Sequence, residues 1–183
     1  MPHMDDKPWS GFKSWVYSLV FRTPKTNKLV VEHAGLTDSD RTLDIGCGPG
    51  AAVRMAAEVA AEAVGVDRAQ PMVDIARKRS RKHANARFEV GSAESLPFPD
   101  GSFTVVWSAH SYHHWEDPTA GLTEVRRVLA ASGRVHILEQ DGKAHGLNDA
   151  QAEQVVAELE GLGFGEVAVA KLDKQVIVSG TAP

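Results

Sequence analysis

The sequence has few of the features that build disulfide-bonded, metal-binding or membrane-spanning proteins. Its 183 residues include one cysteine, Cys47, which excludes an internal disulfide and a zinc site made of several cysteines. It has no uninterrupted apolar run of about eighteen residues, so it predicts no membrane span. Residues Met1 to Asp6 lack the basic and apolar regions of a signal peptide, and we expect a cytoplasmic location.

A strong charge of either sign is also absent. The formal net charge is −4, and 43% of the residues are hydrophobic, which is ordinary for one globular domain with a sizeable core. This balance gives no general reason to expect a nucleic-acid partner. The basic run at residues 77–83 could contact an anion or a membrane surface. We favour the alternative that these cations complement the dipole at the C-terminal end of a helix.

The most informative stretch lies between Leu43 and Asp67. A short apolar run ends in the turn Gly46-Cys47-Gly48-Pro49-Gly50, and an Ala-rich segment leads to a second apolar run that ends at the acid Asp67. This order predicts half of a nucleotide-binding α/β sheet. Glycines let a ligand approach the backbone closely, and a carboxylate at the second strand's end can accept hydrogen bonds from both ribose hydroxyls. We interpret Cys47 as a small space-filling residue rather than a nucleophile.

Strands and helices continue to alternate along the rest of the chain. Apolar spacing predicts one or two helices before the first strand, over 8–21 and 25–34. Further helices are predicted over 51–60, 71–83, 117–129 and 148–162, and strands over 42–45, 63–66, 87–90, 103–107, 133–138, 164–170 and 175–179. This alternation implies a parallel α/β sheet with helices on both faces. The link from Lys171 to Lys174 is too short for a parallel crossover, so the last two strands form an antiparallel hairpin.

The glycine turn, the ribose acid and the closing hairpin together resemble the class I S-adenosylmethionine (SAM)-dependent methyltransferases. The segment Gly91-Ser-Ala-Glu-Ser-Leu-Pro-Phe-Pro-Asp-Gly-Ser-Phe-Thr-Val-Val-Trp-Ser resembles the small-molecule branch that includes quinone-biosynthesis methyltransferases, as does Glu124-Val-Arg-Arg-Val-Leu followed by Gly133-Arg-Val. The resemblance covers roughly Leu43 to Ser179. It implies a Rossmann-like seven-stranded sheet in the order 3-2-1-4-5-7-6 with strand 7 antiparallel. It also implies a SAM-binding core over 41–183 and an N-terminal helical segment over 1–40 that covers the active site.

The resemblance further implies which residues hold SAM. Asp67 would bind the ribose hydroxyls, Arg68 and Met72 would contact the adenine, and the carbonyl of Ser108 would receive the methionine amine. The full set implied is Asp44, Gly46, Cys47, Gly48, Gly50, Asp67, Arg68, Met72, Ser92, Ala93, Glu94 and Ser108. Ser92 departs from the family pattern, which often has an acid there to receive the adenine amino group. Because a neutral hydroxyl is the weaker acceptor, we expect SAM binding of modest affinity.

Histidines follow the predicted fourth strand, on the side where the methyl group is expected. Imidazole exchanges protons near neutral pH, so one of these histidines is a candidate base for a hydroxyl or amine acceptor. His110, which is nearest the end of the strand, is the first candidate, and His113 is the second. The alternative is that these residues only pack the loop. Glu139 or Asp141, at the same edge, would orient a histidine or bind the acceptor. A metal site made of His110, His113 and His114 lacks a strong fourth ligand, and we predict no metal.

The sequence therefore predicts a methyltransferase that moves a methyl group from SAM to a small-molecule acceptor. One alternative is a SAM-binding protein or subunit without catalysis. A nucleic-acid methyltransferase is disfavoured by the acidic net charge and by Ser108-Ala-His-Ser, where an Asn/Asp-Pro-Pro-Tyr type of motif would stand. A nicotinamide-binding fold spaces its glycines as Gly-x-Gly-x-x-Gly, whereas these run Gly-x-Gly-x-Gly.

The connection between Asp141 and Asn148 is short. Its six residues leave no room for the helical lid that many relatives insert here. We therefore expect an acceptor pocket that is open, or that is closed by the N-terminal helices or by the second subunit of a homodimer.

Overall fold

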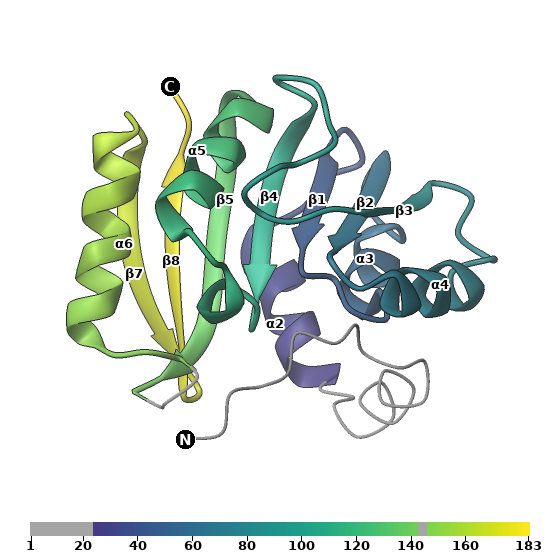
Figure 1. Ribbon diagram of the computed structural model, residues 1–183, viewed down its shortest axis with the longest axis horizontal. Helices are drawn as coiled ribbons and strands as arrows, with labels where there is room; N and C mark the ends of the chain where they lie inside the picture. The colour runs from purple at the N-terminus through teal and green to yellow at the C-terminus, as the bar shows by residue number, and fades with distance from the viewer. Residues whose placement is uncertain (1–23, 143–145) are drawn as a thin grey trace.

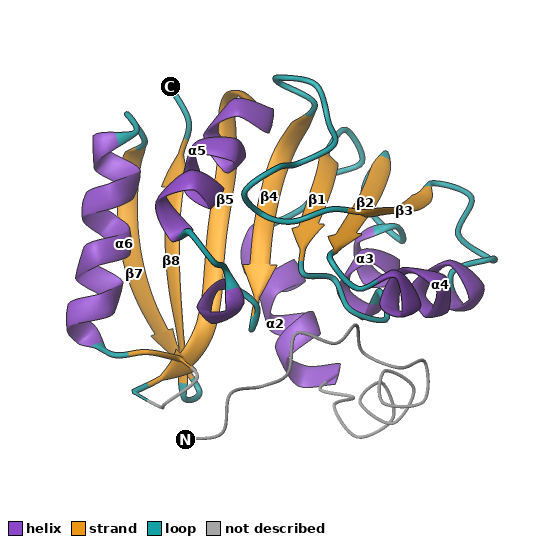
Figure 2. Cartoon of the chain, viewed as in Figure 1, coloured by secondary structure: helices purple, strands orange, loops and turns teal. Residues whose placement is uncertain are grey.

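The computed structural model describes residues 24–142 and 146–183 and shows one central sheet with helices on both faces (Figures 1 and 2). The predicted helix over 8–21 lies outside the described residues. The strands along the sheet are β3 (Ala86–Val90), β2 (Glu62–Asp67), β1 (Arg41–Ile45), β4 (Phe103–Ala109), β5 (Leu129–Asp141), β8 (Gln175–Thr181) and β7 (Gly165–Leu172). This is the order predicted from the sequence, with β7 and β8 as the sixth and seventh strands of the family pattern.

The strand directions also follow the prediction. β3, β2, β1, β4 and β5 pair in parallel, while β8 is antiparallel to both β5 and β7. One short element was not predicted: β6 (Gly146–Leu147) pairs in parallel with the end of β5. The parallel strands β1, β2 and β4 end at the same edge of the sheet, where their arrowheads point in Figure 1. That edge is where ligands bind in open α/β sheets.

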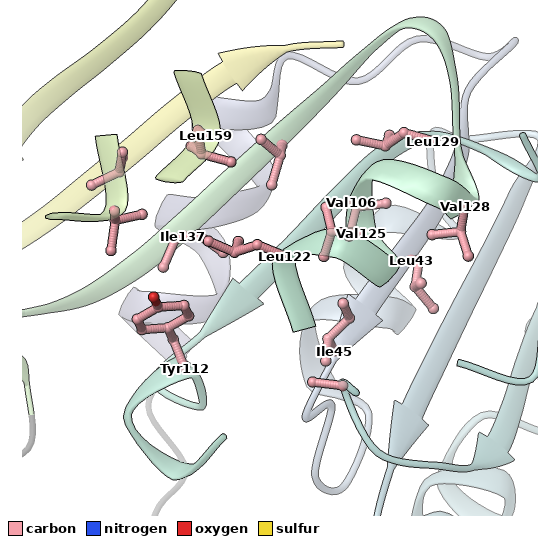
Figure 3. Close-up of a cluster of buried hydrophobic side chains, with 14 of the residues drawn as sticks. Leu43, Ile45, Val106, Tyr112, Leu122, Val125, Val128, Leu129, Ile137 and Leu159 are labelled. Carbon is pink, nitrogen blue, oxygen red and sulfur yellow. The ribbon is translucent and has the colours of Figure 1, made fainter. Parts of the chain in front are cut away.

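Two apolar cores lie on the two faces of the sheet. The helices are α2 (Pro24–Ala34), α3 (Ala51–Ala56), α4 (Gln70–Arg79), α5 (Pro118–Val128) and α6 (Asp149–Gly161), with a 3₁₀ turn η1 (Tyr112–His114). Buried residues of α5 and α6, among them Leu122 and Leu159, pack with Ile137 on one face (Figure 3). Buried residues of α2, α3 and α4, such as Val30 and Val53, form the core of the other face.

Side-chain caps explain where two of the helices begin. Asp117 accepts a hydrogen bond from the N–H of Ala120 at 3.0 Å, and Pro118 follows at a tolerated first-turn position. Asn148 and Gln151 form a reciprocal capping box, which satisfies two backbone N–H groups at the start of α6. Both helix starts are confirmed.

Several element lengths depart from the prediction, among them the helix predicted over 71–83, which ends at Arg79. The helix predicted over 51–60 ends at Ala56, and the strand predicted over 133–138 runs from Leu129 to Asp141. Neighbouring strands explain the longer β5, because it pairs with β4 on one side and with β8 on the other along most of its length. α2 packs against α3, β4 and β5. Coverage of the active site by residues 1–40 stays a prediction.

Candidate functional site

The glycine turn after β1 has left-handed backbone at three positions. The φ angles of Gly46, Gly48 and Gly50 are 77°, 50° and 75°, which L side chains rarely adopt. A Cβ on Gly46 would collide with the side chain of Ser111, and one on Gly50 would lie 2.6 Å from the ring of Phe88. At Gly48 a Cβ would meet no atom within 4 Å. Neighbouring side chains of the protein therefore leave no room for a Cβ at Gly46 and Gly50. Gly48 is the position with the open backbone surface expected for a ligand.

Asp67 ties the end of β2 to this turn. Its Oδ2 accepts a hydrogen bond from the N–H of Gly48 at 2.8 Å, and its Oδ1 accepts one from the N–H of Ala69 at 2.8 Å. Burial raises the pKa of Asp67, while these two bonds to backbone N–H groups act in the opposite direction. A carboxylate offers about four lone-pair sites, so two backbone bonds leave capacity for two hydroxyl groups.

Asp44, near the end of β1, and Cys47, in the glycine turn, are both buried. Asp44 is 4% exposed, and burial raises its pKa to about 8, with the nearby charge of Asp67 adding to the shift. A cationic ligand beside it would favour the ionised carboxylate. Cys47 packs against Gly65, where a Cβ would lie 2.7 Å from its Sγ, and burial raises the pKa of its thiol. This environment supports the space-filling interpretation of Cys47.

The remaining predicted cofactor residues lie around the loops that follow β2, β3 and β4. Arg68 forms an ion pair with Glu116 at 3.1 Å. The carboxylate of Glu94 accepts hydrogen bonds from the N–H groups of Glu116, at 2.8 Å, and Asp117, at 3.4 Å. Glu94 thus holds the segment before α5 through these hydrogen bonds. A contact between Glu94 and SAM stays a prediction. Met72, Ala93 and Ser108 are buried, and Ser92 forms an isolated bridge with Ser95.

These residues fit a ligand that carries a ribose and a positive charge. Gly48 offers open backbone, Asp67 lies at the end of β2, and the buried acid Asp44 is the next-to-last residue of β1. All three belong to the edge where the parallel strands end (Figure 1). SAM has both a ribose and a sulfonium cation.

His110, the residue that follows β4, has an unusual conformation. Its φ is 55°, and its N–H donates a hydrogen bond to the carbonyl of Leu138 at 2.9 Å. Its Nε2 lies 2.6 Å from Oε1 of Gln175, the first residue of β8. Because an amide oxygen only accepts, this contact assigns the proton to Nε2 of His110. A left-handed histidine held by two contacts is a constrained group.

His113 pairs with a buried carboxylate. Its Nδ1 lies 2.9 Å from Oε2 of Glu139, and its backbone N–H donates to Oε1 of the same residue at 3.3 Å. Glu139 is fully buried in β5, which raises its pKa, while His110 and the backbone N–H groups of residues 111–113 oppose the shift. The sequence left open whether Glu139 or Asp141 would orient a histidine. Glu139 lies against His113, whereas Asp141 pairs with Lys171 at 3.2 Å.

Two residues in the site were missed at the level of sequence. Ser111 fills the space beside Gly46, and no sequence signal identifies it. Gln175 reaches His110 because β8 lies beside β5, with Gln140 and Gln175 in register. The predicted strand order already places the start of this strand beside the fifth strand. Gln175 could therefore have been predicted to lie near this edge of the sheet.

Neither a metal cluster nor a membrane helix occurs in the described part of the chain. Within residues 24–142 and 146–183, no three His, Cys, Asp or Glu side chains are grouped so that they could hold a metal ion. In the same ranges, every helix is too short or too polar to cross a bilayer.

Comparison with known proteins decides the family. The family model of the methyltransferase domain matches residues 43–137, a little over half of the chain. The chain belongs to this family. The resemblance to class I SAM-dependent methyltransferases is therefore confirmed, and with it the SAM cofactor that the sequence predicts.

Two curated relatives and one solved structure show how far the similarity of this chain extends. It is 37% identical to the 27-O-demethylrifamycin SV methyltransferase of Amycolatopsis mediterranei, over 81% of this chain and 56% of that protein. It is 40% identical to the demethylmenaquinone methyltransferase of Deinococcus radiodurans, over 58% and 46% of the two chains. A putative SAM-dependent methyltransferase from Methanococcus maripaludis has the same fold, with a TM-score of 0.82, 17% identity and coverage of 100% and 97%. The chain spans about half the length of the curated relatives it matches.

Proposed function

We propose that this chain methylates a hydroxyl group of a small molecule, with SAM as methyl donor and His113 as general base. The observation that carries the proposal is the 2.9 Å contact between Nδ1 of His113 and the buried carboxylate of Glu139. A base is needed only where the acceptor atom carries a proton that must leave, as in a hydroxyl. The His113–Glu139 pair therefore favours a hydroxyl oxygen as the acceptor atom over a carbon atom that needs no base.

The names of the relatives support the choice of a small molecule. They are 27-O-demethylrifamycin SV methyltransferase and demethylmenaquinone methyltransferase, and the first name refers to an oxygen atom. The formal net charge of −4 agrees with an acceptor other than nucleic acid. The cytoplasmic location expected from the sequence stays a prediction.

Asp67 and Asp44 would bind different parts of SAM near the glycine turn. Asp67 would accept the two ribose hydroxyls in addition to its bonds with Gly48 and Ala69. Asp44 would ionise as a cation comes near, because its raised pKa leaves it mostly protonated at neutral pH without one. Bound SAM supplies a methyl group on a sulfonium, which is already activated toward a nucleophile. The protein then mainly has to align the two reactants.

His113, paired with Glu139, would remove the proton from the acceptor hydroxyl. A proton on Nδ1, donated to Glu139, leaves the lone pair of His113 on Nε2. Nε2 would take the proton from the acceptor hydroxyl as the hydroxyl oxygen bonds the methyl carbon. The bond between that carbon and the sulfur would break, and S-adenosylhomocysteine would leave. The carboxylate of Glu139 would stabilise the imidazolium that results.

A screen with variants tests this function. The purified protein is incubated with SAM and a panel of phenols and hydroquinones, and both S-adenosylhomocysteine and the methylated product are measured. His113→Ala should lower kcat by about 100-fold or more with SAM affinity unchanged, and Glu139→Gln should lower it by about 10-fold or more. His83→Ala, far from this edge of the sheet, is the matched control. Normal SAM binding without methyl transfer to any acceptor would favour the non-catalytic alternative.

A further inference from the structure

Two histidines are neighbours of the buried carboxylate of Glu139. His113 contacts it directly, with Nδ1 2.9 Å from Oε2. Strand pairing brings the second one: β4 and β5 stay in register up to Ala109 opposite Leu138, so His110 follows beside Glu139. The backbone N–H of His110 donates to the carbonyl of Leu138 at 2.9 Å. The charge interaction with His110 also opposes the rise in the pKa of Glu139. One carboxylate therefore has two neighbouring imidazole side chains.

Both oxygens of Glu139 are engaged by His113. Oε2 faces Nδ1 of its ring, and Oε1 accepts its backbone N–H at 3.3 Å. As a base, His113 needs its proton on Nδ1 and its lone pair on Nε2. A second imidazole that donated an N–H to the same carboxylate would compete with Nδ1 of His113. The proposed base therefore requires that His110 does not donate to Glu139.

Gln175, the first residue of β8, accounts for this. Its Oε1 lies 2.6 Å from Nε2 of His110. An amide oxygen only accepts, so Nε2 of His110 carries the proton. A neutral imidazole has a single N–H, and Nδ1 of His110 is then without a proton. Neither ring nitrogen of His110 has a proton to donate to Glu139.

The absence of charge on Gln175 matters as well. A carboxylate at this position would favour the imidazolium form of His110, which carries an N–H on both ring nitrogens. The added N–H at Nδ1 could then compete for Glu139. An aliphatic side chain would leave the Nε2–H of His110 without this acceptor. The amide accepts the proton and adds no charge.

We propose that Gln175 is a positioning residue for methyl transfer, which keeps the proton of His110 on Nε2 and so leaves Glu139 to His113. The proposal rests on the proposed function of His113 as the base. Gln175 reaches this edge of the sheet because β8 is antiparallel to β5, with Gln175 opposite Gln140. It acts through His110 and needs no contact with SAM or the acceptor.

Long-range proton–nitrogen NMR of the imidazole rings tests the proposal without SAM or acceptor. At about pH 8 an ordinary histidine is neutral, and the spectrum shows which ring nitrogen carries the proton. In the wild type we expect the proton on Nε2 of His110 and on Nδ1 of His113. In Gln175→Leu, Nδ1 of His110 can carry the proton and compete for Glu139, so both preferences should weaken. Unchanged proton positions in Gln175→Leu would overturn the proposal.

Gln175→Glu is the second variant, because it keeps an acceptor oxygen and nearly the same shape. Its charge should give His110 an N–H on both ring nitrogens at a pH where the wild type has one. A purely structural role for Gln175 would not produce this change, and a wild-type spectrum of His110 would contradict the proposal. Gln70→Leu, an exposed glutamine bonded to Asp74 on α4, is the control and should keep the wild-type spectrum.

Kinetic measurements separate this proposal from the proposed function. Gln175→Leu should lower kcat by about 10-fold, with SAM affinity unchanged. If Gln175→Leu shifts the protons but neither it nor His113→Ala alters kcat, the proposed base is wrong, while the proton on Nε2 of His110 is confirmed. If only His113→Ala lowers kcat, the proposed base is supported and the positioning role of Gln175 is wrong.

Discussion

The carboxylate of Asp67 accepts a hydrogen bond from the backbone N–H of Gly48 at 2.8 Å. This bond joins the end of β2 to the turn that follows β1. The acid predicted to bind the ribose and the glycine with open backbone surface therefore form one structural unit. A change at either residue should affect both the shape of the turn and the affinity for SAM.

Gly46→Ala should destabilise the fold through its contact with Ser111. The new Cβ would overlap the side chain of Ser111, and φ is 77° there, so we expect a loss of about 2–4 kcal/mol. The double variant Gly46→Ala with Ser111→Gly should recover part of this loss. Gly48→Ala, where the space is open, should cost only about 1 kcal/mol of backbone strain. Urea unfolding of all four proteins checks this; no recovery in the double variant would contradict it.

Asp44→Asn should stabilise the protein without ligand at high pH. Burial raises the pKa of Asp44 from 3.8 to about 8 in the folded state, so between these values the folded state holds a proton that the unfolded state has lost. The contribution of Asp44 to stability therefore falls as pH rises from about 4 to 8. Since Asn does not ionise, the variant should exceed the wild type by about 1–3 kcal/mol at pH 8 and match it near pH 4. Urea unfolding across this range tests it, and a constant difference would count against it.

His136 should make the fold sensitive to acid. It is buried on β5, with Nδ1 2.9 Å from Oγ of Ser179, and burial lowers its pKa from 6.5 to about 3, aided by His33 and Arg134. Below pH 6.5 the unfolded state binds a proton that the folded state does not, so stability falls as pH falls toward 3. Between pH 6.5 and 4.5 the wild type should lose about 1–3 kcal/mol more than His136→Gln.

Thermal or urea unfolding at pH 6.5, 5.5 and 4.5 measures this difference. The variant His83→Gln, outside both buried clusters, is the control and should keep the wild-type dependence. Parallel curves for the wild type and His136→Gln would show that His136 does not carry the effect.

Local signals were enough to predict most of the fold. The start of α5 at Asp117 and Pro118 depends on a cap and a proline, which are readable in four residues of sequence. The antiparallel hairpin followed from the length of its link. β6 was missed because two residues carry no periodicity, and its pairing with β5 depends on tertiary contact.

The site was less predictable because it depends on contacts between distant residues. The sequence placed Glu139 and Asp141 equally well, since both follow the strand predicted over 133–138 at the same edge of the sheet. The neighbour Lys171 lies beside Asp141, and the turn η1 brings His113 onto Glu139. The explanation of the glycines was correct only in part, because Ser111 and Phe88 crowd two of the three. No local pattern contains these contacts.

SAM binding to wild type and Asp67→Ala tests the central claim most directly. Isothermal titration calorimetry should show one saturable site in the wild type. Asp67→Ala should weaken binding by about 10-fold or more, because it removes the ribose acceptor and the bond that holds Gly48. Asp74→Ala, an exposed acid on α4, should bind as the wild type does. Unchanged affinity in Asp67→Ala, or no saturable binding in the wild type, would contradict this placement of the cofactor.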